Sequence, residues 1–98
     1  MVLKDKVAVV TGASSGMGYV IAAEYAKEGA KVLAVARRAE RLENLVKETE
    51  GYAGKVVAYA ADLSNMDAAE KIIDEAVRQF GKVDILVNNA GIMDDFSP

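Results

Sequence analysis

The feature that most constrains the fold of this chain is a glycine-rich segment between an apolar run and a helical pattern. The segment reads TGASSGMG over residues 11–18 and follows the apolar run at residues 7–10. Gly12 can adopt the positive φ of a tight turn, Gly16 lets backbone N–H groups approach an anion, and Gly18 lets a helix pack closely on the strand. A helix start also presents unpaired N–H groups and the positive end of its dipole. The segment therefore predicts a strand–turn–helix that suits a dinucleotide pyrophosphate.

The spacing of these glycines does not by itself identify a ligand site. It is G-x-x-x-G-x-G, with two more residues between the first and second glycine than in the fingerprint G-x-G-x-x-G. A glycine cluster alone also fits an ordinary structural turn. The other segments of the chain must decide between a ligand site and a simple turn.

Short apolar runs alternate with helical patterns along the whole sequence. We expect strands over residues 7–10, 32–36, 56–60 and 84–87 and helices over residues 17–28 and 39–49. Gly29 should cap the first helix in the left-handed conformation. A third helix should start at a capping box of Ser64 and Asp67 and end at Gly81. Its apolar stripe would consist of Ile72, Ile73, Ala76, Val77 and Phe80.

The arrangement of these elements follows from their order. All four strands are apolar without strict alternation, which is typical of strands buried on both faces. Strands that alternate with helices form right-handed βαβ units. The pattern predicts an α/β fold, a Rossmann-type doubly wound parallel sheet with the partial strand order 3-2-1-4. The first two helices should share one face and the third should cover the other. Thr11-Gly12 and the segment Asn88-Asn89-Ala90-Gly91 would then meet in one crevice.

Composition narrows the classes of function. The chain has 98 residues, 52% of them hydrophobic, and a net charge of −3 at pH 7, which argues against nucleic acid as a partner. It has no cysteine and no histidine, so it offers no disulfide framework and lacks the commonest general base and metal ligand. We find no apolar stretch that could span a membrane and no signal-peptide pattern. We therefore expect a cytoplasmic protein without membrane partners.

Taken together, the motifs resemble those of the short-chain dehydrogenase/reductase family. TGASSGMG matches the family's cofactor loop T-G-x-x-x-G-x-G, and Asn88-Asn89-Ala90-Gly91 matches its N-N-A-G motif. The resemblance implies hydride transfer between a nicotinamide cofactor and a carbonyl or alcohol substrate. Separately, we expect a homo-oligomer, because Ile85, Leu86 and Val87 would form an apolar edge strand that favours pairing with another chain. The resemblance also implies these cofactor-binding residues: Gly12, Ser14, Ser15, Gly16, Met17 and Gly18 around the pyrophosphate, Asp62 and Leu63 at the adenine, and Asn89, Ala90 and Gly91 at the nicotinamide-side ribose.

The end of the second strand predicts which nicotinamide cofactor binds. Members of the family that bind NAD carry an acidic residue there, whereas this chain has Ala36 followed by Arg37-Arg38. Loss of the carboxylate removes repulsion, and a guanidinium can hold a 2′-phosphate through two hydrogen bonds. We therefore expect NADP rather than NAD, with Ser14 as a possible extra donor. The alternative is that Arg37, Arg38 and Arg41 form a solvated helix start. Glu40 and Glu43 would then be their ion-pair partners.

The acid/base residues of the family have no match here. They include a Tyr with a Lys four residues later, but the residues four positions after the tyrosines of this chain are Ala23, Gly29, Val56 and Leu63. We expect residues 1–98 to be the NADP-binding N-terminal part of such an enzyme, without the C-terminal catalytic part and inactive alone. One alternative is a stand-alone or engineered nucleotide-binding module without catalysis. Another is a flavodoxin-like or receiver domain, although a receiver's first strand normally ends in acidic residues.

Overall fold

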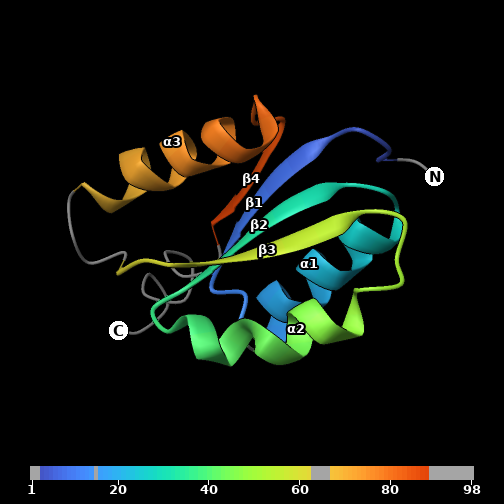
Figure 1. Ribbon diagram of the computed structural model, residues 1–98. Helices are drawn as coiled ribbons and strands as arrows, with labels where there is room; N and C mark the ends of the chain where they lie inside the picture. Colours follow the sequence, from blue (N-terminus) through green and yellow to red (C-terminus); the bar gives the residue numbers. More distant parts are fainter. Residues whose placement is uncertain (1–2, 15, 63–66, 89–98) are drawn as a thin grey trace.

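The architecture is a parallel sheet with helices on both faces, seen in a computed structural model that describes residues 3–14, 16–62 and 67–88 (Figure 1). The strands are β1 (Val7–Thr11), β2 (Lys31–Ala36), β3 (Lys55–Ala60) and β4 (Ile85–Asn88). The helices are α1 (Gly16–Lys27), α2 (Glu43–Glu48) and α3 (Ala68–Phe80), with a 3-10 turn η1 (Ala39–Leu42) before α2. All paired strands run parallel in the order β3-β2-β1-β4, which confirms the predicted topology.

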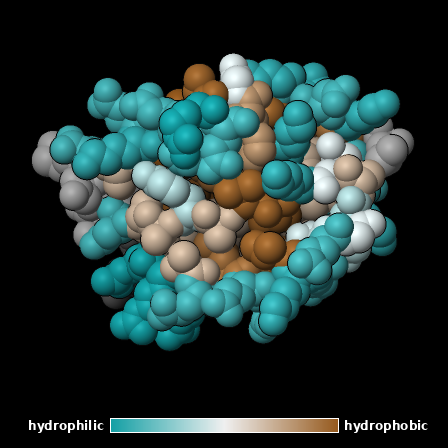
Figure 2. Space-filling model, in the orientation of Figure 1, coloured by the Kyte–Doolittle hydropathy of each residue, from teal (hydrophilic) through white to brown (hydrophobic). Residues whose placement is uncertain are grey.

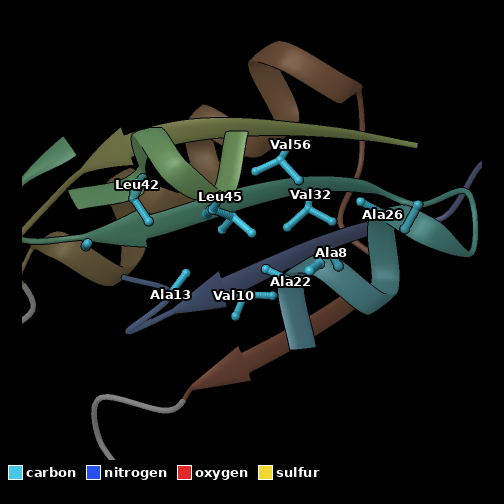
Figure 3. Close-up of a cluster of buried hydrophobic side chains, with 13 residues drawn as sticks. Ala8, Val10, Ala13, Ala22, Ala26, Val32, Leu42, Leu45 and Val56 are labelled. Carbon is cyan, nitrogen blue, oxygen red and sulfur yellow. The ribbon is translucent and has the colours of Figure 1, made fainter. Parts of the chain in front are cut away.

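The core lies in two layers, one on each face of the sheet. α1 and α2 cover one face and α3 covers the other (Figure 1), as right-handed crossovers on either side of β1 require. Figure 3 shows the larger layer, in which Ala22 and Ala26 of α1 and Leu42 and Leu45 pack against Val32 and its neighbours in the sheet. The smaller layer combines Val9, Leu33, Val35, Ile72 and Ala76.

The sheet is more exposed at its margins than the sequence pattern predicts. Every residue of β1 is buried, and β2 is buried from Val32 onward. β3 and β4, the outer strands of the described sheet, are only partly buried, and Leu86 is 57% exposed. In Figure 2, a band of hydrophobic surface lies over β3, between the hydrophilic surfaces of α3 and α2. The prediction that all four strands are buried on both faces is therefore wrong for these two.

The helices also differ from the prediction in detail. The segment expected as one helix over residues 39–49 is a 3-10 turn followed by a short α-helix, with Leu42 at the junction. In α3, Ile72 and Ala76 are buried, but Val77 is 45% exposed, so it lies outside the apolar stripe. Asp67 directly precedes α3, whereas Ser64 lies outside the described residues. Gly29 and Gly81 have φ values of 99° and 88°, which confirms the left-handed cap expected at Gly29.

Both ends of β4 are fastened to β1. At the amino end, the Val7 N–H donates to the Asp84 carboxylate (2.9 Å) and the Asp84 N–H donates to the Val7 carbonyl (2.8 Å). At the carboxyl end, Thr11 Oγ1 lies 3.2 Å from both the Val87 carbonyl and Asn88 Oδ1. The hydrogen bond from Val7, followed by that from Lys82, lowers the pKa of Asp84. These contacts set which residues of β4 face the end of β1.

Candidate functional site

The carboxyl ends of the four parallel strands bring those predicted site residues that the structure describes to one edge of the sheet. Two backbone hydrogen bonds hold the segments that leave this edge: Ala13 N–H donates to the Val35 carbonyl (3.1 Å), and Ala61 N–H donates to the Ala36 carbonyl (2.9 Å). The first fixes the glycine loop beside β2, and the second fixes the start of the segment that contains Asp62. Helices leave on opposite faces on either side of β1, which is where ligands bind in open sheets of this kind.

The glycine loop has the backbone geometry that its sequence predicts. Gly12 and Gly16 have φ values of 63° and 61°, in the left-handed region that favours glycine. α1 begins at Gly16, so its free N–H groups lie at this edge. Among the described residues, a Cβ at Gly16 would meet no atom within 4 Å, so the backbone there is open to an approaching group. Gly18 is buried, as expected for a residue that allows α1 to pack on the sheet.

The side chains of the loop differ in exposure. Ser14 is half-buried, and Met17 is 72% exposed beside the first turn of α1. Ser15 lies outside the described residues, as do Leu63, Asn89, Ala90 and Gly91. The predicted roles of these five residues therefore stay predictions. Asn88, the last residue of β4, is described and lies beside Thr11 through the contact given above.

The end of β2 combines a small buried residue with exposed cations. Ala36 is 7% exposed, whereas Arg37, Arg38 and Arg41 are exposed. The ion pairs within the described residues are Arg78–Glu75 and Lys82–Asp84, so none of these three arginines has a carboxylate partner there. This finding removes the salt-bridge part of the solvated-helix alternative. Their guanidinium donors remain available to an anion at the sheet edge.

Sequence reasoning missed one polar contact near the glycine loop. Tyr19, directly after Gly18, donates its hydroxyl to Glu48 Oε1 at 2.7 Å and so ties the first turn of α1 to the last residue of α2. The hydrogen bond to Glu48 raises the pKa of Tyr19 above its ordinary value. A tyrosine that exchanges protons near neutral pH needs a shift in the opposite direction. The contact therefore gives Tyr19 a structural role between α1 and α2.

Two features are absent from the part of the chain that the structure describes. It contains no cluster of three or more acidic side chains that could hold a metal ion. None of its described helices is long and apolar enough to cross a bilayer.

Comparisons with known proteins agree with this geometry. The family described as short chain dehydrogenase matches residues 6–98. An 11-beta-hydroxysteroid dehydrogenase-like 2 of Arabidopsis thaliana is 51% identical over 89 residues, which cover 89% of this chain and 29% of the relative. A 3-oxoacyl-(acyl-carrier-protein) reductase of Thermotoga maritima is 42% identical over 95 residues, which cover 97% of this chain and 39% of the relative.

Solved structures show the same relationship. A metagenomic short-chain oxidoreductase in complex with NADP superposes with a TM-score of 0.82 at 36% identity, covering 88% of this chain and 39% of that one. A dehydrogenase/reductase from Sinorhizobium meliloti 1021 superposes with a TM-score of 0.83 at 43% identity, covering 89% and 35%. The fold thus defines a Rossmann-type α/β unit. More specifically, the chain belongs to the short-chain dehydrogenase family and spans 29% to 39% of the length of these four relatives.

Proposed function

We propose that residues 1–98 form the NADP-binding N-terminal part of an oxidoreductase that transfers hydride between the cofactor and a carbonyl or alcohol substrate. The observation that carries the proposal is that two features lie at one edge of the sheet. The first is the glycine loop at the start of α1, in which Gly12 and Gly16 have left-handed φ values. The second is the group of arginines after β2, which have no carboxylate partner among the described residues. Family membership supports the reaction class. The NADP complex of one structural neighbour supports the cofactor class.

The residues of the glycine loop suit a pyrophosphate. The open backbone at Gly16 lets the N–H groups of the first turn of α1 reach an anion. The half-buried Ser14 would add a hydroxyl donor, and Met17 would lie against the adjoining ribose. When bound, the nicotinamide ring supplies or accepts the hydride. The part that we assign to this chain is to hold and orient that ring.

The residues after β2 and β3 suit an adenosine that carries a 2′-phosphate. Arg37 and Arg38 would bind the phosphate, because they are exposed and have no carboxylate partner among the described residues. The small Ala36 leaves no carboxylate to repel the phosphate. Asp62, held near Ala36 through the hydrogen bond of Ala61, would contact the adenine. Leu63, Asn89, Ala90 and Gly91 complete the proposed set.

Titration of the intact protein with NADPH and NADH tests this assignment. We expect tighter binding of NADPH, because a charge-assisted contact contributes about 1.5–3 kcal/mol, or about ten- to a hundredfold in affinity. The double variant Ala36→Asp with Arg37→Ala should lose this preference. Arg78→Ala, which removes an exposed arginine from α3, is the matched control and should keep it. Equal affinities in the unchanged protein would contradict the proposal.

A second candidate function is a nucleotide-binding module without catalysis. It is favoured by the sequence of these 98 residues, in which no tyrosine is followed four positions later by lysine and there is no histidine. A turnover assay with NADPH and a panel of carbonyl compounds separates the two candidates. NADPH binding with background turnover in the intact protein would favour the module. We also propose that the intact protein is a homo-oligomer, which light scattering can measure.

A further inference from the structure

A second cluster of cations surrounds a cavity at the opposite edge of the sheet from the glycine loop. The cavity has a volume of about 190 Å³. It is formed where the N-terminal turn, the turn between α1 and β2 and the turn before β3 come together. Lys4, Asp5, Gly29, Lys31, Ala53, Gly54 and Lys55 line it.

Backbone hydrogen bonds hold the walls of this cavity in place. Leu3 N–H donates to the Glu28 carbonyl (3.0 Å), and Lys31 N–H donates to the Lys6 carbonyl (2.9 Å). Gly54 N–H donates to the Ala26 carbonyl at 2.8 Å, next to the bond from Lys55 N–H to the Ala30 carbonyl at 3.0 Å. The three segments are therefore fastened to one another, and the cavity does not depend on the positions of mobile side chains alone.

The lysines that line the cavity outnumber its carboxylates. Lys31 and Lys55 are directly paired in the register of β2 and β3, so their side chains leave the sheet on the same face at neighbouring positions. Like charges placed opposite each other on a sheet are unfavourable. Lys4 adds a third ammonium group, against the single carboxylate of Asp5. Among the described residues, none of the three lysines forms an ion pair.

We propose that this cavity, which we call the lysine pocket, is a binding site for a phosphate dianion. The three lysines that line the cavity can supply ammonium groups to a doubly charged tetrahedral anion. They would attract this dianion more strongly than chloride, because the attraction grows with the charge of the ion. The site is separate from the proposed cofactor site, since it lies at the amino ends of β2 and β3. Phosphate binding would relieve the repulsion between Lys31 and Lys55.

The test uses the intact protein and inorganic phosphate. Thermal unfolding is followed as phosphate replaces sodium chloride at constant ionic strength and pH 7.5, because a ligand of the native state raises the midpoint in a saturable way. We expect a saturable rise in the unchanged protein. Lys31→Gln with Lys55→Gln should need at least about tenfold more phosphate for the same rise, as expected when charge-assisted contacts are lost.

The control carries the same change of charge elsewhere. Lys47→Gln with Lys71→Gln removes two exposed lysines from α2 and α3 and should respond like the unchanged protein. Both double variants keep the glycine loop and Arg37, so phosphate bound there contributes equally to both. Without phosphate, the Lys31/Lys55 variant should be at least as stable as the unchanged protein, because the repulsion is gone. Equal phosphate responses of the two variants, or no response beyond that to chloride, would overturn the proposal.

Discussion

Gly54 occupies a position where even one added carbon atom should weaken the fold. A Cβ built there would lie 2.0 Å from the Ala30 carbonyl oxygen and 2.8 Å from the Ala26 carbonyl oxygen. Carbon–oxygen contacts are normally about 3.3 Å or longer, so the turn before β3 would have to move by about 1.3 Å. That movement breaks or lengthens the hydrogen bonds from Gly54 to Ala26 and from Lys55 to Ala30. Each such bond contributes about 1 kcal/mol, and overpacking adds about 1–3 kcal/mol.

We therefore expect Gly54→Ala to lower the free energy of unfolding by about 3–5 kcal/mol, a large part of the stability of a typical domain. Urea denaturation followed by circular dichroism measures this change. Gly51→Ala, three residues earlier in the same turn region, is the matched control, because a Cβ there meets no atom within 4 Å. The control should be neutral or slightly stabilising, since alanine reduces the entropy of the unfolded chain. Similar losses in both variants would refute the steric argument.

Two further changes probe the core and the attachment of β4. Val9 is fully buried in the centre of β1, so Val9→Ala should lower the free energy of unfolding by about 2–3 kcal/mol. Val20 is 58% exposed on α1, so Val20→Ala should change it by almost nothing. Equal losses in the two variants would contradict the burial of β1. Asp84→Asn should lower stability at pH 7, because the native state lowers the pKa of this carboxyl below its ordinary value of 3.8. A carboxyl group whose pKa is lowered in the native state stabilises that state at pH values above its unfolded-state pKa. This stabilisation is lost as the pH falls through the native pKa. Urea midpoints of the two proteins should therefore differ at pH 7, and the difference should shrink only as the pH falls below 3.8 and through the native pKa. A difference that does not shrink as the pH falls through that range would argue against a charge effect.

The predicted topology succeeded because it depends on patterns that are local in sequence. Four apolar runs, separated by helical patterns, leave a parallel sheet with right-handed crossovers as the natural solution. The glycine loop was predictable for the same reason, since Gly12 takes the positive φ expected of a tight turn directly after a strand. Gly29 at the end of α1 is a third example.

Features that depend on distant contacts were not predictable. Nothing in the sequence around Gly54 shows that its Cα lies against the carbonyl of Ala30, because that contact forms only when β3 pairs with β2. Asp84 was expected to be the first residue of the fourth strand, but it lies just before β4 and accepts the N–H of Val7, 77 positions away. The break of the helix after β2 at Leu42 was also missed, because the packing of Leu42 and Leu45 against the sheet decides the path of the chain there.

The attachment of β4 at both ends matters for the site. It sets which residue of β4 reaches the carboxyl edge of the sheet beside β1, where the helices leave on opposite faces. The register pairs Thr11 with Asn88 and Ala8 with Ile85. A slip of one residue would move each side chain of β4 to the opposite face and displace Asn88 along the strand by about 3.3 Å. The apolar residues of β4 resist such a slip only weakly, because Leu86 is largely exposed in the described sheet. The polar contacts of Asp84 with Val7 and of Thr11 with Asn88 therefore carry much of the register. The predicted cofactor contacts of Asn89, Ala90 and Gly91 depend on these two contacts, because the segment begins where β4 ends.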